Sequence, residues 1–309
     1  MMRMRVFLCA LAVAGFLFAS RLYAGSEDGV SPDRMLRIGF SKSYFSDVGV
    51  RDAKAAIEVW AKEVVGTAVA HYTPSAVVFS TLRSMENAIR NGEVEMITLR
   101  SPDYLRIKDK VALEPVAIAT VTETVGDEYV LLVHRDRDIT GIGQLKDGAV
   151  FMQKMGQSSV ARMWLDILLM KEGFFEKAPF FVRIEEVKKE SQGVLKVFFK
   201  QAVACVVRRS TYDTMSELNP QIREQLTVLM RSPRYATDVF CFTNSLQGTD
   251  REHLKKACLR LERFPTGRQI LTLFKQGRVL PFKSSYLESV EELFREYQDI
   301  KARLGETRP

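Results

Sequence analysis

The sequence predicts an α/β protein of two lobes, each a mixed, mostly parallel sheet flanked by helices, with a ligand cleft between the lobes. First, strand and helix patterns alternate between about residues 35 and 121, which is typical of parallel α/β layers. Second, the same alternation restarts near residue 129. Third, 309 residues allow about two domains, and a composition that is 46% hydrophobic and 27% charged can build packed cores.

The elements of the first lobe follow from hydrophobic periodicity. Alternating apolar residues predict a strand at 35–40, and Ile57, Trp60, Ala61 and Val64 form the apolar stripe of a helix at 51–65. We expect Gly66 to end that helix, because glycine is common just after a helix C-terminus. The remaining elements are expected as strands at 68–72, 94–99 and 116–121, and a helix from Thr73-Pro74-Ser75 to about 91–92.

The second lobe and the return to the first follow the same pattern. Strands are expected at 129–133, 150–152, 180–184, 203–207 and 239–243, and helices at about 160–171, 191–199, 251–263, 266–275 and 286–304. The chain should therefore cross between the lobes near 124–129 and 230–238. These crossings predict one lobe of residues 33–126 plus 235–309 and a second lobe of residues 127–234.

The N-terminus has the pattern of a secretory signal peptide at residues 1–24. Arg3 and Arg5 precede an apolar run at 6–20, and Leu22-Tyr23-Ala24 resembles a cleavage site. The run is shorter than a spanning helix, although a retained membrane anchor is the alternative. Cleavage would leave 42 basic against 38 acidic residues, a net charge of +4 instead of +7. We expect the mature protein to be exported, which in a bacterium means the periplasm.

Several function classes lack their sequence signals. The basic residues are scattered rather than clustered, so no nucleic-acid partner is expected. The three histidines, His71, His134 and His253, are isolated, and no Cys or His pair has metal-ligand spacing. Nucleophile-elbow, P-loop and dinucleotide motifs are missing. We therefore predict a binding protein rather than an enzyme, with no cofactor and no metal, although a catalytic site assembled from distant residues stays open.

Cysteine usage gives no disulfide framework. Three cysteines follow the predicted cleavage site, namely Cys205, Cys241 and Cys258. Cys205 lies in an apolar run and is expected to be a buried small hydrophobe. A bridge between Cys241 and Cys258 is left open.

The segment 150–164 is the main candidate for ligand binding. A short strand is followed by Gly156, Gln157, Ser158 and Ser159, and then by a helix. A helix start leaves backbone N–H groups unpaired and favours negative charge, so these residues could hold an anion. The alternative is an ordinary serine cap without a ligand.

Two further patches could face that segment from the first lobe. One is the loop from Ser41 to Tyr44, for which the alternative is an ordinary solvent-exposed loop without a ligand. The other is Arg100 and Ser101 at the end of a strand, where a guanidinium could grip an oxyanion with two hydrogen bonds. The alternative for Arg100 is a side chain that reaches to the solvent.

Several segments together resemble a known family. These are 88–96 (helix, Gly and strand), 129–136 (strand into the second lobe), 142–148 (turn), and 265–271 with 279–282 (late helix and turn). From about Leu36 to Tyr286 the chain resembles the phosphate-, phosphite- and phosphonate-binding proteins of ABC transporters, which have the type II periplasmic binding fold. The resemblance implies a monomeric solute-binding protein, a small anionic ligand, and an ABC permease in the inner membrane as partner.

The pocket positions depart from the family's pattern. Gly156 to Ser159 replaces its Ser-Thr-Ser-Gly turn, Ala76 replaces an aromatic residue, and Ser191 stands in place of a histidine, which makes Ser191 a further candidate site residue. Ala204 replaces an aspartate that holds a ligand amino group, and Arg100 replaces uncharged residues. These changes favour a purely anionic ligand over an aminophosphonate.

Two other functions are compatible with the same resemblance. The protein could present its ligand to a sensor protein instead of a permease, or it could be an enzyme built on the binding-protein fold. In all three cases the ligand would enter between lobes that close by a hinge motion.

Overall fold

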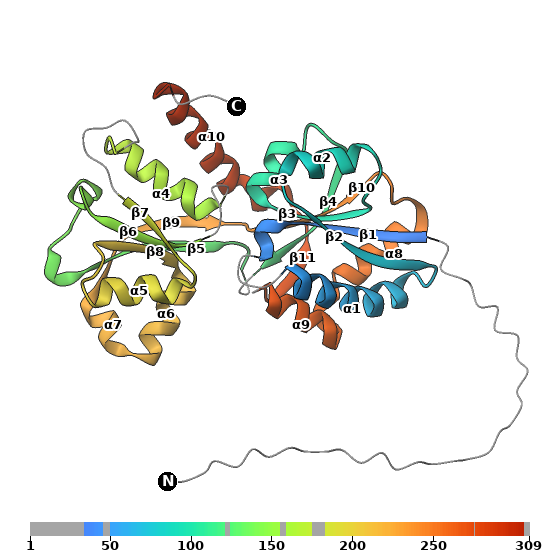
Figure 1. Cartoon of the computed structure of the whole chain (residues 1–309), viewed down its shortest axis with the longest axis horizontal. Helices are drawn as coiled ribbons and strands as arrows, with labels where there is room; N and C mark the ends of the chain where they lie inside the picture. Colours follow the sequence, from blue (N-terminus) through green and yellow to red (C-terminus); the bar gives the residue numbers. More distant parts are fainter. Residues whose placement is uncertain are drawn as a thin grey trace, which may run out of the picture. The chain divides into compact units, whose positions relative to one another are not determined.

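The computed structural model describes residues 34–45, 50–120, 124–154, 159–174, 183–274 and 276–305. They form two mixed sheets with helices on both faces, which confirms the predicted fold class (Figure 1). The predicted signal peptide at residues 1–24 lies outside the described residues.

The first sheet contains six strands in the order β11-β4-β10-β3-β1-β2. Strands β1, β2 and β3 are parallel, whereas β10 is inserted antiparallel between β3 and β4, and β11 is antiparallel to β4. The strands are β1 (Arg34–Ser41), β2 (Tyr72–Phe79), β3 (Met96–Arg100), β4 (Leu113–Thr120), β10 (Asp238–Thr243) and β11 (Arg278–Pro281).

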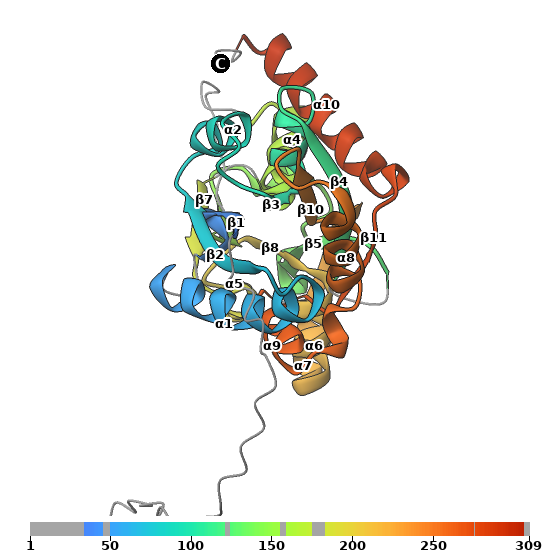
Figure 2. The ribbon, with the colours of Figure 1, turned by 90° about the vertical axis from the view of Figure 1, so that its right-hand side faces the viewer.

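Helices cover both faces of the first sheet, with α2 and α3 opposite α1, α8 and α9 (Figure 1), and Figure 2 shows α2 and α1 on opposite faces from the side. Neighbouring residues of β3 show why: Met96 packs in the core on the α1 side, and Ile97 packs in the core on the α2 side. The helices are α1 (Val50–Ala68), α2 (Leu82–Arg90), α3 (Ser101–Ile107), α8 (Gly248–Cys258) and α9 (Pro265–Leu273).

The second sheet contains five strands in the order β7-β6-β8-β5-β9. Strands β6, β7 and β8 are parallel, and β5 is antiparallel to both β8 and β9. Helix α4 lies on one face and α5 to α7 on the other (Figure 1). The elements are β5 (Asp127–His134), β6 (Ala149–Gln153), α4 (Val160–Lys171), β7 (Arg183–Val187), α5 (Glu190–Phe198), β8 (Ala204–Arg208), α6 (Arg209–Leu218), α7 (Pro220–Gln225) and β9 (Leu226–Tyr235).

Helix α10 (Glu288–Arg303) packs against α3, which flanks the first sheet, and against α4 and β9 of the second. Its buried residues Val290 and Leu293 belong to a core that also contains residues of α3 and α4. Lys171 of α4 pairs with Glu296 at 2.6 Å. Five short 3-10 helices complete the described elements: η1 (Lys42–Phe45), η2 (Arg135–Arg137), η3 (Ile142–Leu145), η4 (Leu261–Arg263) and η5 (Ser284–Leu287).

The chain changes sheet between β4 and β5 and again between β9 and β10. The second connection is held by Ser101, whose N–H donates to the carbonyl of Thr237 at 2.8 Å and whose hydroxyl donates to the carbonyl of Ala236 at 2.5 Å. Next to the connections, the N–H of Tyr129 in β5 donates to the hydroxyl of Ser232 in β9 at 2.8 Å. The exact lobe boundaries at 126/127 and 234/235 stay a prediction.

The sequence prediction is wrong at residues 66–80. Gly66 does not end a helix, because α1 continues to Ala68 and packs against β2 along its length. The expected strand at 68–72 and the expected helix from Thr73 are replaced by β2, which pairs with β1 over eight residues. Pro74 is tolerated there because β2 is an edge strand.

Candidate functional site

Two arginines occupy matching places in the two sheets. Arg100 is the last residue of β3 and precedes α3, and Arg208 is the last residue of β8 and precedes α6. Both have the same extended backbone, with φ and ψ of −66° and 143° for Arg100 and −63° and 142° for Arg208. Each follows an apolar strand interior, so the backbone places a guanidinium where a parallel strand ends. In open α/β sheets this edge is where ligands bind.

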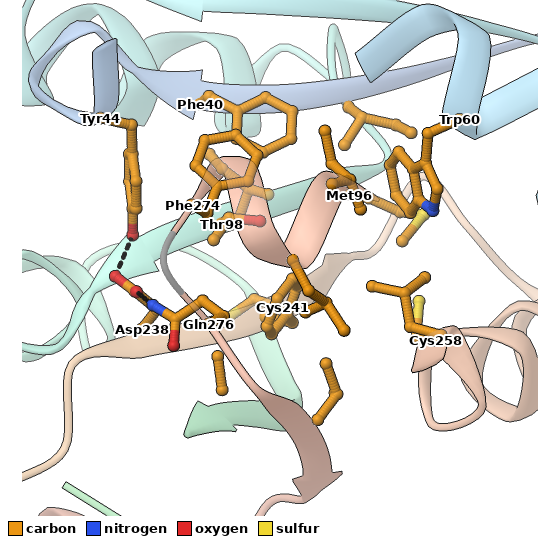
Figure 3. A pocket seen from close by; sticks show the side chains of 18 residues that line it. Phe40, Tyr44, Trp60, Met96, Thr98, Asp238, Cys241, Cys258, Phe274 and Gln276 are labelled. Carbon is orange, nitrogen blue, oxygen red and sulfur yellow. Dashed lines mark hydrogen bonds between the residues drawn. The ribbon is translucent and has the colours of Figure 1, made fainter. Parts of the chain in front are cut away.

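Arg100 lies in a cluster with Asp238, Tyr44 and Gln276. Asp238 is directly opposite Arg100 in the antiparallel register of β10 and β3. The Nη1 of Arg100 is 3.8 Å from Oδ1 of Asp238, and its guanidinium lies 4.6 Å from the centre of the Tyr44 ring. The two oxygens of Asp238 already accept hydrogen bonds, one from the hydroxyl of Tyr44 at 2.7 Å and one from Nε2 of Gln276 (Figure 3).

This cluster leaves one donor of Arg100 unused. Among the described residues, the buried Nε of Arg100 has no hydrogen-bond partner. Burial lowers the pKa of Arg100, but Asp238, Tyr44, Tyr129 and Asp103 together outweigh burial and raise it, so the guanidinium stays charged. Burial and Asp238 raise the pKa of Tyr44 well above its ordinary value, so its hydroxyl stays neutral and keeps donating. A buried cationic N–H without an acceptor is costly, and an incoming oxyanion could supply that acceptor.

Arg208 is bound more tightly within the protein. Its Nε lies 3.1 Å and 3.2 Å from the two carboxylate oxygens of Glu190, the first residue of α5. The hydroxyl of Thr211 also donates to Glu190. Glu190 is 6% exposed, so this is a buried ion pair with its carboxylate well supplied with donors.

Asp127 and Tyr129 of β5 interact electrostatically with members of both clusters. Tyr129 is buried and interacts electrostatically with both Arg100 and Arg208. Asp127, the first residue of β5, is 7% exposed and accepts no hydrogen bond from any described residue. Burial raises the pKa of Asp127 to about 6; the charge of Arg208 opposes this rise, and the charges of Glu190 and Asp238 add to it. Three buried carboxylates and two half-buried guanidiniums therefore form these clusters.

The structure brings together some of the residues that the sequence singled out. Tyr44 and Arg100 are in direct contact, although Arg100 is held by Asp238 rather than extended to solvent. Ser41 is half-buried at the end of β1, and Ser191 is half-buried in the first turn of α5, next to Glu190.

Two predicted hydroxyls have structural partners instead. Ser159 is the N-cap of α4, and its hydroxyl, on a residue that is 1% exposed, accepts from the N–H of Arg162 at 3.2 Å. This is the ordinary serine cap that the sequence left open. The hydroxyl of Ser101 is taken by the carbonyl of Ala236. Gln157 and Ser158 lie outside the described residues. Ligand contact by these four residues stays a prediction.

Sequence reasoning missed Asp127, Glu190, Arg208, Asp238 and Gln276. A signal was present for three of them, since Asp127 and Asp238 each open an apolar strand and Arg208 closes one, as Arg100 does. Glu190 and Gln276 gave no such signal, because their partners are 18 and 38 residues away along the chain.

A small apolar cavity adjoins the Arg100 cluster. Tyr44, Asp238 and Gln276 form its polar end, and its volume is about 40 Å³ (Figure 3). An apolar cavity that admits benzene measures about 150 Å³, so this one is too small for a ligand of that size. Its apolar lining includes Phe40, Trp60, Met96, Cys241, Cys258 and Phe274. Cys241 and Cys258 are both free thiols, so the structure does not contain the bridge that the sequence left open.

No cluster of three or more potential metal ligands occurs among the described residues. Likewise, no helix in the described part of the chain is long and apolar enough to cross a membrane.

Comparison with protein families decides the identity of the chain. The family described as the phosphonate ABC transporter periplasmic substrate-binding protein matches residues 61–286. The chain belongs to this family. Proteins of the family are periplasmic and bind a small substrate for an ABC transporter. Among curated proteins, no match is found.

Solved structures of the family's fold align over most of the chain. XAC2383 from Xanthomonas citri, solved with chloride, is 13% identical with a TM-score of 0.64, and the alignment covers 87% of this chain and 99% of that one. PhnD1 from Prochlorococcus marinus, solved with methylphosphonate, is 14% identical with a TM-score of 0.57 and coverages of 87% and 99%. A phosphonate-transporter binding protein from Pseudomonas aeruginosa (PA3383) is 14% identical with a TM-score of 0.58 and coverages of 87% and 88%. At these identities the likeness shows the fold alone, which is the two-lobed type II periplasmic binding fold.

Proposed function

We propose that this protein binds a small oxyanion of the phosphonate type in the periplasm and presents it, as a monomer, to the permease of an ABC transporter. Residues 1–24 would direct its export and be removed. Family membership supports delivery to a permease over the alternatives of a sensor partner or an enzyme. The finer parts, which are the anionic ligand and the residues that hold it, rest on the site described above.

One observation carries the anionic ligand: the buried Nε of Arg100 has no acceptor among the described residues. Asp238 does not supply one, because its oxygens accept from Tyr44 and Gln276 and lie no closer than 3.8 Å to the guanidinium. A phosphonate oxygen would satisfy Nε with a charge-assisted hydrogen bond. The ring of Tyr44, 4.6 Å from the guanidinium, helps to hold it in place.

The proposal keeps the other predicted contacts as ligand candidates. Gln157, Ser158 and Ser159 would offer backbone N–H groups before α4, and Ser41 and Ser191 would contribute hydroxyls. The lobes of residues 33–126 plus 235–309 and of 127–234 would close over the ligand by bending at the two connections between the sheets.

Titration calorimetry with methylphosphonate, phosphite and phosphate tests the proposal. We expect Arg100→Gln to weaken the affinity for the most tightly bound of these anions by about 10- to 100-fold, which is the contribution of a hydrogen bond to a charged group. Arg106→Gln is the matched control, because Arg106 lies in α3 six residues later and pairs with Asp103 at 3.0 Å. Equal affinities for the wild type and Arg100→Gln would remove Arg100 from the site. Failure of all three anions to bind the wild-type protein would refute the proposed ligand class.

A further inference from the structure

Helix α10 follows β11 of the first sheet in the chain, yet it is anchored to elements of the second sheet. In the first turn of α10, the hydroxyl of Ser289 donates to the carbonyl of Arg234 in β9 at 2.6 Å. Further along, Glu296 pairs with Lys171 of α4 at 2.6 Å. Figure 1 shows α10 beside α4, against which it packs. The helix is thus fastened at more than one point to the lobe that precedes it in the chain.

The apolar face of α10 explains this docking in part. Apolar residues recur in the helix at intervals of three and four, namely Val290, Leu293, Tyr297 and Ile300, so they share one side of it. All four pack in one hydrophobic core, and the hydroxyl of Tyr297 also donates to Asp166 of α4 at 3.5 Å. The same core contains residues of both α3 and α4. The polar contacts therefore decide which lobe carries the helix.

The polar contacts of α10 with the first lobe are the weaker ones. Glu291 pairs with Lys108, at the end of α3, at 3.7 Å, and their side chains are 40% and 34% exposed, so solvent screens this pair. The guanidinium of Arg106 in α3 lies 5.5 Å from the centre of the Phe294 ring. Neither contact is a hydrogen bond, whereas the first turn and the middle of α10 hydrogen-bond to β9 and α4.

A short exposed segment connects α10 to the first sheet. Phe282, just after β11, is fixed to that sheet, because its N–H donates to the carbonyl of Val116 in β4 at 3.2 Å. Residues 283–285 are exposed, and Leu287 is buried again in the core that receives the apolar face of α10. An exposed segment between two anchored ones can absorb changes of φ and ψ that packed elements cannot.

We propose that α10 is a strap that moves with the second lobe, and that residues 283–286 form a third connection between the lobes. Chain order assigns α10 to the lobe of residues 33–126 plus 235–309, whereas its hydrogen bonds join it to the lobe of residues 127–234. Rotation of the lobes bends the chain at three connections instead of two. The contacts of α10 with α3 slide during this rotation, and those with α4 and β9 persist. This behaviour does not depend on which ligand the protein binds.

Hydrogen exchange of the ligand-free protein tests this assignment with two matched variants. Val194→Ala loosens the core beneath α5 in the second lobe, and Val64→Ala loosens the core beneath α1 in the first. Both valines are buried, and neither core contains a residue of α10. We expect Val194→Ala to speed amide exchange in α10 and α4 at least about fivefold, because elements of one cooperative unit open together. Val64→Ala should speed exchange in β1 and leave α10 within about twofold of the wild type. Acceleration of α10 by Val64→Ala alone, by both variants equally or by neither would overturn the strap.

Distances between paired spin labels give a second test that leaves both cores intact. The cysteines of the described residues are buried, so labels attach to cysteines introduced at exposed positions, namely Gln298→Cys in α10, Gln221→Cys in α7 and Glu252→Cys in α8. When methylphosphonate, phosphite or phosphate binds, we expect the distance between 298 and 252 to change and that between 298 and 221 to stay the same. Any other pattern with bound anion would overturn the strap. If none of the three anions binds, the proposed function is refuted, and the exchange result alone decides for or against the strap.

Discussion

The Arg100 cluster and the Arg208 cluster begin from the same local design and end with different hydrogen bonding. Both arginines close an apolar strand with the same backbone conformation. Arg208 donates through Nε to both oxygens of Glu190 at 3.1 Å and 3.2 Å, whereas Nε of Arg100 has no partner among the described residues. This difference separates the roles of the two arginines. Arg208 stabilises the fold through its ion pair with Glu190, and Arg100 retains an N–H group that can donate to a ligand.

The largest expected effect is on stability and separates the two arginines. We expect Arg208→Gln to lower the free energy of unfolding by about 3 kcal/mol, because it leaves Glu190 as a buried carboxylate without its cation. Arg100→Gln should cost only about 1 kcal/mol, because Asp238 keeps its donors Tyr44 and Gln276. Urea unfolding of the two variants measures both values. Equal losses of unfolding free energy in the two variants would contradict the distinct roles of the two arginines.

The second effect is the pH dependence that Asp127 gives to the free energy of unfolding. Burial raises the pKa of Asp127 from 3.8 to about 6, so between these values the folded state holds a proton that the unfolded state has lost. The free energy of unfolding should therefore rise, by up to about 2 kcal/mol from this group, as pH falls from about 7 to about 4. Asp127→Asn should remove this rise, and Glu128→Gln should keep it. The measurement is urea unfolding across that range, and the same pH slope in the wild type and Asp127→Asn would contradict the assignment.

The smallest effect tests the connection between the clusters. Ser101→Ala removes the hydrogen bond to the carbonyl of Ala236 and leaves that buried acceptor unpaired, which should cost about 1 kcal/mol. Ser210→Ala is a control of similar size, since Ser210 is exposed in the first turn of α6. If thermal unfolding shows the Ser101 variant to be as stable as the wild type, that connection is not held as described.

The fold was largely predictable, because its core strands are long apolar runs that alternate with helical stripes. The errors at Gly66 and at 68–80 have a common cause. Sequence rules predict that Gly66 ends a helix and that Pro74 does not lie within a strand. Packing of α1 against β2 and the edge position of β2 override both tendencies. Strands β9 and β11 were missed because Ser232 with Pro233, and Pro281, interrupt their apolar patterns.

The site was predictable only in part. Tyr44 and Arg100 were found because a polar group at the end of an apolar strand is visible in one segment. Whether an arginine is free or paired depends on residues distant in sequence, such as Asp238 for Arg100 and Glu190 for Arg208. The sequence therefore could not show which carboxylates balance these two cations.

A crystal structure of the protein with methylphosphonate tests the central claim most directly. The account predicts a phosphonate oxygen within hydrogen-bond distance of Nε of Arg100, with Arg208 still bound to Glu190. A ligand bound elsewhere, with Nε of Arg100 still lacking an acceptor, would contradict it.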